Sequence, residues 1–289
     1  MKIKFLAIGI LAISIITSCK KNEENGGSTT VQASTQLNVA YGTSTLQNMD
    51  VYLPAGRSAA TTKVMVLIHG GAWSLGDKTD FTAYVDTLKN RFPTYAIFNI
   101  NYRLSVFPNN LFPTQEMDTK AAIEFIYNKR NDYLISDKFV LLGASAGAHL
   151  ALLHAYKYQS PVKIKAVVDF FGPTDMVDIY NNPGVVPQSS VATIVGATPT
   201  TNAALYQSSS PINFITTASA CPTIIFQGSS DPLVNAVTQS ATLNTKLQAM
   251  NVPQSFTLYA GKGHGDDWGN ALFFDAFTKI QAFVNTHNP

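Results

Sequence analysis

The sequence carries little charge and no excess of either sign. Charged residues make up 13% of its 289 residues, about half of the share that is usual in globular proteins. Lys2 and Lys4 account for two of the 20 basic residues, and the remaining 18 balance the 18 acidic ones. Nucleic-acid binders need clustered Lys and Arg, and disordered chains combine high charge with low hydrophobicity. Because 46% of the residues are hydrophobic, both classes are excluded and a folded core is expected.

The N-terminal apolar run is too short to cross a bilayer. It covers 13 residues, from Phe5 to Thr17, whereas a transmembrane helix needs about 17–25. A basic start, a short apolar run and a small-residue cleavage site are typical of a secretory signal. Ile16-Thr17-Ser18-Cys19 resembles the lipobox of bacterial lipoproteins, which implies a signal peptide over residues 1–18 and a lipid on Cys19. The protein is then expected to be anchored to a membrane of the bacterial cell envelope, most readily the outer membrane. Whether it faces the periplasm or the cell surface stays open. A plain signal peptide without a lipid is the alternative.

Cysteine is also scarce. Apart from Cys19 the chain contains only Cys221, so no intrachain disulfide is expected even in an exported protein. Residues 19–36 are polar and centre on Gly26-Gly27-Ser28-Thr29-Thr30, which is typical of a flexible tether. No Cys, His and carboxylate residues cluster at metal-ligand spacing, so neither a metal nor an organic cofactor is expected.

Strand-like and helix-like segments alternate from residue 37 onward. Continuous apolar runs such as Val64–Ile68 are typical of strands buried on both faces of a parallel sheet, and the alternation favours a doubly wound α/β fold. The first two strands have no helix between them, so we expect them to pair antiparallel at one edge of an eight-stranded, mostly parallel sheet. Residues 37–289 are interpreted as one domain with helices on both faces of that sheet. The predicted strands are Leu37–Tyr41, Gln47–Leu53, Val64–His69, Tyr95–Asn101, Lys138–Leu142, Ala166–Phe171, Thr223–Gln227 and Ser255–Tyr259. The predicted helices span 79–91, 114–129, 146–158, 236–250 and 270–286.

The segment from Gly172 to Ile215 interrupts this alternation. It is rich in Pro, Ser, Asn and Thr and only weakly periodic. A long irregular insertion in a compact domain is usually functional or mobile, and this one begins near the carboxyl end of a strand, where ligands bind in such sheets. We therefore expect residues 172–215 to form a small cap over the site; a passive surface excursion is the alternative.

The motif Gly143-Ala144-Ser145-Ala146-Gly147 predicts a nucleophile. It follows the apolar run Phe139–Leu142 and opens a helix, and a G-x-S-x-G sequence at a strand–turn–helix junction is typical of a nucleophile elbow. Such an elbow needs a sharp turn that exposes the hydroxyl, and the two glycines let strand and helix approach closely. The helix N-terminus also favours developing negative charge. Ser145 is therefore the predicted nucleophile.

A serine hydroxyl needs a general base. His264 lies in the glycine-rich segment 261–267 after the last predicted strand, where a loop can carry an imidazole back over the edge of the sheet. It is the predicted base. His149 and His154 follow Ser145 on its helix and are interpreted as structural. Asp266 and Asp267 are expected to solvate the loop or to contact a ligand.

The base in turn needs a carboxylate that fixes its tautomer. Asp231 follows the predicted strand Thr223–Gln227 and gives the chain order Ser…Asp…His that this architecture requires. It is the predicted acid. Asp169 and Asp175, near the end of the preceding strand, remain alternatives, although Asp175 can instead cap a turn or helix.

A glycine-containing turn, His69-Gly70-Gly71-Ala72-Trp73, follows the apolar run Val64–Ile68. Backbone N–H groups of such a turn, together with the N–H after the nucleophile, bind the oxyanion of a tetrahedral intermediate. The predicted oxyanion hole is therefore Gly71, Ala72 and Ala146. Trp73 is predicted to contact the substrate, and a role as a core anchor is compatible with this.

Residues 37–289 resemble the α/β-hydrolases of the carboxylesterase and hormone-sensitive-lipase-like group, and are most similar there to small acetylxylan or feruloyl esterases. Ala72 stands where many relatives have a third glycine, and its Cβ would narrow the acyl site. The resemblance further implies that Arg103 and Asp118 form a buried supporting pair. Beyond the triad, it is carried by His69–Trp73, Gly76-Asp77-Lys78, Asn101–Ser105, Phe112–Gln115 with Asp118, Gly172–Asp175 and Ser210-Pro211-Ile212.

The resemblance implies a serine hydrolase that cleaves acetyl or feruloyl esters on plant polysaccharide through an acyl-enzyme. Its partners would be a small or polymeric ester and, through the lipid, a membrane, but no nucleic acid. The same motifs serve different substrates, so a kynurenine formamidase-like amidase and a general carboxylesterase or lipase remain alternatives. A non-catalytic glycan-binding lipoprotein is a third.

Overall fold

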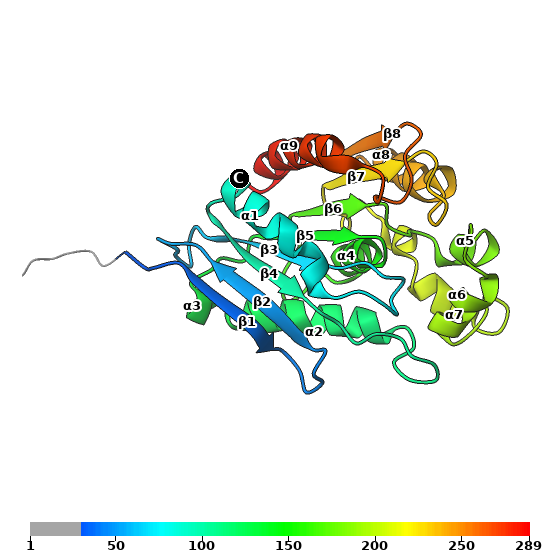
Figure 1. Ribbon diagram of the computed structural model, residues 1–289, viewed down its shortest axis with the longest axis horizontal. Coiled ribbons are helices and arrows are strands. Elements are labelled where there is room, and N and C mark those ends of the chain that lie inside the picture. The colour runs from blue at the N-terminus through cyan, green and yellow to red at the C-terminus, as the bar shows by residue number, and fades with distance from the viewer. Residues whose placement is uncertain (1–29) are drawn as a thin grey trace, which may run out of the picture. The chain divides into compact units, whose positions relative to one another are not determined.

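The computed structural model describes residues 30–289, which form an eight-stranded sheet with helices on both faces (Figure 1). The strand order is β1-β2-β4-β3-β5-β6-β7-β8. Strands β3 to β8 run parallel, and β2 pairs antiparallel with both β1 and β4. The predicted α/β class and the antiparallel edge are thus confirmed. The strands are β1 (Ser34–Ala40), β2 (Asn48–Leu53), β3 (Lys63–Ile68), β4 (Tyr95–Ile100), β5 (Phe139–Ala144), β6 (Ala166–Phe170), β7 (Thr223–Gly228) and β8 (Gln254–Tyr259).

In the described part of the chain, helices alternate with the strands from β3 onward. Two of the predicted helices are composite: a 3-10 helix, Lys78–Phe81, precedes α1, and a π-helix, Ala236–Ala241, precedes α8. The α-helices are α1 (Thr82–Arg91), α2 (Thr114–Asn128), α3 (Arg130–Tyr133), α4 (Ala146–Lys157), α5 (Met176–Asn181), α6 (Gln188–Val195), α7 (Ala203–Ser208), α8 (Thr242–Ala249) and α9 (Gly269–His287).

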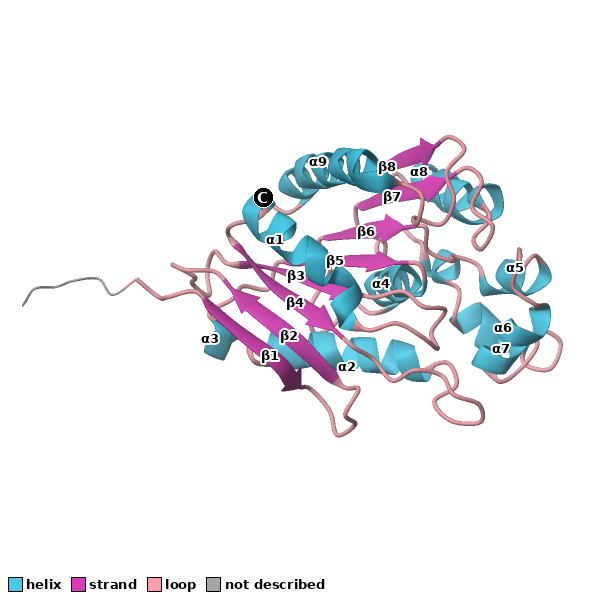
Figure 2. Ribbon diagram, in the orientation of Figure 1, coloured by secondary structure: helices cyan, strands magenta, loops and turns pink. Residues whose placement is uncertain are grey.

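The apolar strands divide the core into two layers. In β3, Val64, Val66 and Ile68 pack with residues of α2, α4 and α8, whereas Met65 and Leu67 pack with residues of α1 and α9. Successive side chains of a strand point to opposite faces of the sheet, so a strand covered on both faces must be apolar throughout. Figure 2 shows the two helical layers on either side of the magenta strands.

The segment 172–215 is more regular than the sequence indicates. It contains α5, α6, α7 and a 3-10 helix, Pro211–Phe214. The expectation of an irregular segment is therefore corrected: these helices are too short for an apolar period to register, and local capping defines them instead. Asp175 and Asn202 accept hydrogen bonds from the first turns of α5 and α7, and Gly196 ends α6 in a left-handed conformation.

The sheet begins earlier than expected. Strand β1 starts at Ser34, and Thr35 and Gln36 pair with Tyr52 and Val51 of β2, so the end of the expected tether belongs to the sheet. The expected signal peptide, Cys19 and the tether as far as residue 29 lie outside the described residues. Within residues 30–289, no helix is both long enough and apolar enough to cross a membrane.

Candidate active site

Ser145 occupies a sharp turn between β5 and α4. Its backbone has φ 54° and ψ −121°, a strained conformation for a non-glycine residue, and its N–H donates to the Phe170 carbonyl at 2.8 Å. The flanking glycines are sterically required. A Cβ on Gly143 would lie 2.3 Å from the Gly147 carbonyl oxygen, and one on Gly147 would lie 2.0 Å from the Ile68 carbonyl oxygen. Close packing of β5, α4 and β3 therefore holds the serine in this turn.

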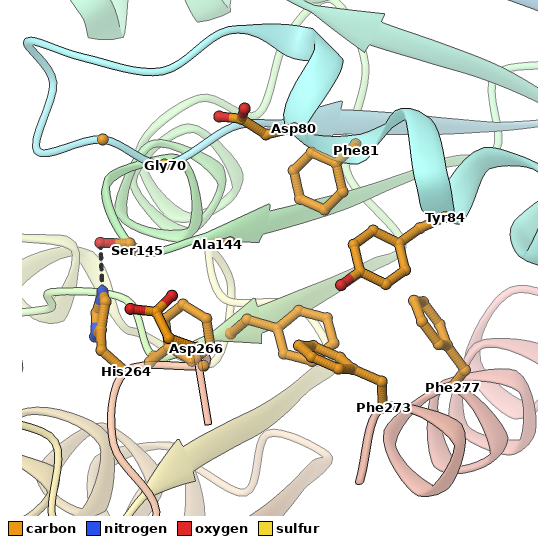
Figure 3. A pocket seen from close by; sticks show the side chains of 14 residues that line it. Gly70, Asp80, Phe81, Tyr84, Ala144, Ser145, His264, Asp266, Phe273 and Phe277 are labelled. Atoms are coloured by element: carbon orange, nitrogen blue, oxygen red, sulfur yellow. Dashed lines mark hydrogen bonds between the residues drawn. The ribbon is translucent and has the colours of Figure 1, made fainter. Parts of the chain in front are cut away.

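Three side chains from separate loops form a hydrogen-bonded relay. His264 Nε2 lies 2.8 Å from Ser145 Oγ, and His264 Nδ1 lies 2.6 Å from Asp231 Oδ2. Figure 3 shows the contact between Ser145 and His264 as a dashed line. The Asp231 side chain is fully buried and that of His264 is 13% exposed. The structure thus brings together the serine, histidine and aspartate that the sequence singled out.

Asp231 is held in its ionised form. Its Oδ1 accepts the backbone N–H groups of Leu233 and Val234 at 2.8 and 3.0 Å, and its Oδ2 accepts the Gln227 amide at 2.8 Å. Burial raises the pKa of Asp231, but the hydrogen bond and charge of His264 and the backbone donors outweigh it and leave the pKa below its ordinary value. A carboxylate in this position stabilises a protonated imidazole beside it.

Gln227 is a site residue that the sequence analysis missed. It lies at the end of β7 and is fully buried. Its Oε1 accepts the Ser240 hydroxyl at 2.7 Å, which orients the amide so that its NH2 group faces Asp231. A polar residue within the otherwise apolar strand Thr223–Gly228 is the feature of the sequence that could have indicated this role.

The two alternative acids do not join the relay. Asp175 accepts the N–H groups of Val177 and Asp178 and caps α5. Asp169 is fully buried in β6, where its Oδ1 accepts the Gly172 N–H at 2.8 Å and its Oδ2 has no hydrogen-bond partner among the described residues. Burial raises the pKa of Asp169 to about 7. Asp231 is thus the carboxylate that contacts the histidine.

The turn after β3 presents consecutive residues in left-handed conformations. Gly71, Ala72 and Trp73 have φ values of 103°, 48° and 59°. A Cβ on Gly71 would lie 2.1 Å from the Leu75 carbonyl oxygen, so this position accepts only glycine. Ala72 adopts a φ that glycine would reach more easily, so its methyl group is carried at some cost in backbone strain.

The predicted oxyanion donors are free to bind. Among residues 30–289, the N–H groups of Gly71 and Ala72 have no hydrogen-bond acceptor, and Ala146 begins α4, where N–H groups lack an acceptor within the helix. The turn lies against the nucleophile, since a Cβ on Gly70 would come within 3.2 Å of Ser145 Cβ. The three donors and the serine hydroxyl thus belong to one site.

His69 and Tyr102 support this turn from beneath. Their rings stack at 4.3 Å, and the Tyr102 hydroxyl donates to the carbonyls of His69 and Gly70 at 3.0 and 3.2 Å. His69 Nδ1 lies 2.7 Å from the Gly70 carbonyl oxygen. Burial lowers the pKa of His69, so its neutral ring serves as a structural support.

His149 connects the oxyanion turn to the cap, a role that the sequence analysis did not assign. Its Nδ1 accepts the Trp73 indole N–H at 3.1 Å, and its Nε2 donates to the Ser209 carbonyl at 2.7 Å. The ring is fully buried, which lowers its pKa to about 4, so it remains neutral. His149 lies four residues after Ser145 and therefore on the same helix face, and this spacing could have indicated a role near the site. His154, also buried in α4, has its pKa lowered to about 3 for the same reason.

A large aromatic cavity opens on one side of the serine. Its volume is about 370 Å³, and both Ser145 and His264 line it. Figure 3 shows these two residues at one end, with Tyr84, Phe273 and Phe277 at the other. Two carboxylates, Asp80 and Asp266, also line it. The aromatic lining consists of Phe81, Tyr84, Phe170, Phe171, Phe273 and Phe277.

A second, smaller cavity lies on the other side of the serine. Its volume is about 80 Å³, and Ala72, Trp73, Ser145 and Ala146 are among the residues that line it. Segment 172–215 supplies much of the remaining wall, so this segment does reach the site. The outer wall consists of Pro173, Ile179, Pro183, Val186, Val191, Ile194, Leu233 and Val234.

Arg103 and Asp118 form the expected ion pair. The guanidinium donates to both carboxylate oxygens at 2.9 and 2.7 Å, and Gln47 adds a third donor at 2.8 Å. Asp118 is buried, but the Arg103 side chain is 34% exposed, so the expectation of a buried pair is wrong for Arg103. Within the described range, no group of three or more His, Cys, Asp or Glu residues is arranged to hold a metal ion.

The sheet order and the serine turn after β5 define the class of this molecule, which is an α/β-hydrolase. Solved structures share this fold. The chain superimposes on a bifunctional GH43-CE protein from Bacteroides eggerthii with a TM-score of 0.77 and 26% identity, covering 88% of this chain and 35% of that one. A truncated carbohydrate esterase from gut microbiota matches with a TM-score of 0.74 and 23% identity, covering 89% of this chain and 98% of that one.

More narrowly, the chain belongs to the BD-FAE family, which it matches over residues 49–247. This span contains Ser145 and Asp231 and ends before His264. Among curated proteins, the chain is similar to esterase LipQ of Mycobacterium tuberculosis, with 26% identity over 193 residues. The match covers 63% of this chain and 44% of LipQ, so the chain spans less than half the length of this relative.

Proposed function

We propose that the protein is a serine hydrolase of carboxylic esters in which Ser145 is the nucleophile, His264 the general base and Asp231 the orienting acid. The observation that carries this proposal is the continuous relay from Ser145 Oγ through the imidazole to the buried carboxylate, with contacts of 2.8 and 2.6 Å. Membership of the BD-FAE family and similarity to LipQ, which is named an esterase, support it.

The geometry accounts for each step of ester cleavage. Ser145 Oγ attacks the ester carbonyl carbon while His264 Nε2 takes the hydroxyl proton, and Asp231 stabilises the resulting imidazolium. The carbonyl oxygen becomes an oxyanion that the N–H groups of Gly71, Ala72 and Ala146 bind. His264 then donates its proton to the leaving alcohol, which leaves an acyl-serine. A water molecule attacks this acyl group while His264 takes one of its protons. The bond between the acyl carbon and Ser145 Oγ then breaks, His264 returns the proton to Oγ, and the carboxylic acid departs.

The proposed substrates are acetyl or feruloyl esters on plant polysaccharide. The similarity to solved proteins that are described as a GH43-CE and a carbohydrate esterase supports a carbohydrate alcohol. The aromatic lining of the large cavity is also suited to sugars, since aromatic side chains offer an apolar face with few competing polar groups.

Hydrolysis of p-nitrophenyl acetate by the purified protein and by Ser145→Ala tests the activity. Removing a nucleophile that acts in a relay is expected to lower kcat by at least about 10³-fold. N-formyl anilides assayed in parallel report amidase activity. Turnover of the formamide but not of the ester would replace the proposal with the amidase alternative. Equal background rates for both proteins, with retained glycan binding, would replace it with the binding-module alternative.

We also propose that Cys19 carries a lipid that anchors the enzyme to the bacterial envelope, because the lipobox-like Ile16-Thr17-Ser18-Cys19 ends the apolar run. Expression of the wild-type chain and Cys19→Ala in a bacterium, with a labelled fatty acid, tests this. The wild type is expected to carry label and to sediment with membranes, whereas the variant is expected to do neither. Unlabelled wild-type protein would instead indicate a plain signal peptide.

A further inference from the structure

The two cavities beside Ser145 differ in which catalytic groups they contain. The large cavity of about 370 Å³ is lined by His264, Gly265 and Asp266 of the base loop. The small cavity of about 80 Å³ is lined by Ala72 and Ala146 and by no residue of the base loop, whereas the third oxyanion donor, Gly71, lines the large cavity. Each cavity must therefore receive a different part of an ester whose carbonyl carbon lies at Ser145.

The direction of proton transfer decides which part goes where. The leaving alcohol oxygen must come within hydrogen-bond distance of His264 Nε2, because it takes its proton from there. The alcohol therefore extends into the cavity that His264 lines. The acyl chain leaves the carbonyl carbon in a different direction from the alcohol, so it extends into the small cavity, which no residue of the base loop lines.

The size of the small cavity then limits the acyl group. An apolar cavity of about 150 Å³ accommodates a benzene ring, which is nearly twice the volume available here. Ile179, Val191 and Ile194 of the cap line it with branched side chains. Ala72 contributes a methyl group where glycine would leave space. An acetyl to butyryl chain fits these walls, whereas the ring of an aromatic acyl group does not.

The large cavity, which receives the alcohol, does not limit the size of that group in the same way. Tyr84, Phe273 and Phe277 line both the large cavity and a second hollow between α1 and α9. Arg91 and Phe274 also line that hollow, and Phe274 is 68% exposed. A bulky alcohol such as a sugar chain can therefore extend from Ser145 across this aromatic surface.

We propose that the cap segment 172–215 restricts the enzyme to short aliphatic acyl groups, acetyl to butyryl, carried on a large alcohol, and that aromatic acyl groups are excluded. This inference rests on the proposed esterase function and narrows its acyl group. Ile179 and Val191 are the specificity-determining residues that it identifies.

The test is the dependence of kcat/KM on the acyl group with one fixed leaving group. The p-nitrophenyl esters of acetate, butyrate, octanoate and ferulate are compared for the wild type, with Ser145→Ala as the background. Forcing extra carbon atoms into a packed site is unfavourable. We therefore expect kcat/KM to fall by about 10- to 100-fold between butyrate and either octanoate or ferulate.

Two substitutions in the cap test whether its side chains set the size limit on the acyl group, and one substitution in the large cavity is the matched control. Ile179→Ala and Val191→Ala enlarge the small cavity and are expected to raise the octanoate-to-acetate ratio of kcat/KM by about tenfold. Phe273→Ala removes a comparable apolar side chain from the large cavity and is expected to leave that ratio unchanged. Because Ile179 and Val191 are buried, a thermal melt and retained acetate turnover verify that each variant folds.

The outcomes separate this inference from the function on which it rests. If the wild type hydrolyses every ester only at the Ser145→Ala rate, the esterase function fails and the acyl limit fails with it. If the wild type is active and cleaves the ferulate ester as fast as the acetate, the esterase function stands and the acyl limit is overturned. A ratio that responds to Phe273→Ala but to neither cap variant would reverse the assignment of the two cavities.

Discussion

The loops at the carboxyl edge of the sheet and the cap segment 172–215 meet at the same serine but are built differently. The edge loops follow β3, β5, β7 and β8, and their conformations are fixed by strand pairing and by close backbone contacts such as that of Gly147 with β3. The cap consists of α-helices of six to eight residues with local capping hydrogen bonds and of a four-residue 3-10 helix. Its exposed positions include Val185, which is 72% exposed.

This difference implies that the edge loops carry out the reaction, whereas the cap selects the substrate. The groups proposed to move protons and bind the oxyanion all lie on the edge loops, where small displacements are resisted by the sheet. The cap contributes apolar walls, whose side chains can change without disturbing the relay. The two regions are joined at a few buried points, including His149 with Ser209 and Asp169 with Gly172. Substitutions on either side of this division, and at its junctions, test it.

The largest difference is expected between two aspartates. Asp231→Asn cannot stabilise a protonated His264 and permits the wrong tautomer, so kcat is expected to fall about 10³- to 10⁴-fold, the scale seen for the equivalent change in other Ser-His-Asp enzymes. Asp175→Asn is the matched control in the cap, where the side chain only caps α5, and it is expected to change kcat by less than tenfold. Steady-state kinetics with p-nitrophenyl acetate measure both, and equal losses would show that the cap takes part in the chemistry.

A smaller effect is expected at the junction between oxyanion turn and cap. His149→Phe leaves the Trp73 indole N–H and the Ser209 carbonyl without partners, which costs about 1–3 kcal/mol for each buried group. We expect kcat to fall about tenfold because the turn that carries Ala72 shifts. His149→Gln can both donate and accept, so it is expected to restore part of kcat. If Phe and Gln lower the melting temperature equally but leave kcat unchanged, His149 has no positioning role.

The sequence was sufficient wherever a local pattern fixes a local geometry. Ser145 could be predicted because Gly143 and Gly147 make a strand–turn–helix junction that few other folds require. The strands could be predicted because both faces of the sheet are covered, which makes runs such as Val64–Ile68 apolar throughout. The position of Asp231 followed from its loop and from the chain order, without any knowledge of what surrounds it.

The sequence was insufficient where a role depends on contacts between distant residues. Gln227 orients the acid only because Ser240, from a π-helix thirteen positions later, fixes its amide. His149 connects Trp73 and Ser209, which lie on opposite sides of it in the chain. The cap helices were missed because their few residues are held by caps and by packing on the domain rather than by an apolar period.

The second junction, at Asp169, predicts a pH dependence of stability. Its pKa is about 7 in the folded protein against an ordinary value of 3.8, so the folded state retains a proton that the unfolded state releases. Stability is therefore expected to fall as pH rises from about 4 to 7, by on the order of 1.4 kcal/mol per unit, and to level off above that. Asp169→Asn keeps the acceptor for the Gly172 N–H and removes the titration. Melting curves at pH 5 and pH 8 should show the decline in the wild type and not in the variant; parallel declines would contradict this.

The smallest effect is expected farthest from the serine, on the exposed aromatic surface of α9. Phe274 is 68% exposed, and Arg91 lies over its ring at 5.1 Å, so Phe274→Ala is expected to change stability by less than about 0.5 kcal/mol. If the alcohol side extends this far, the variant raises KM about two- to fivefold for an acetylated xylo-oligosaccharide while KM for p-nitrophenyl acetate stays constant. Val237→Ala, at an equally exposed apolar position beside α8, is the matched control and is expected to affect neither substrate. Equal KM values for Phe274→Ala and Val237→Ala on the oligosaccharide would confine the alcohol to the large cavity, and the open side of the site would then end at Tyr84 and Phe273.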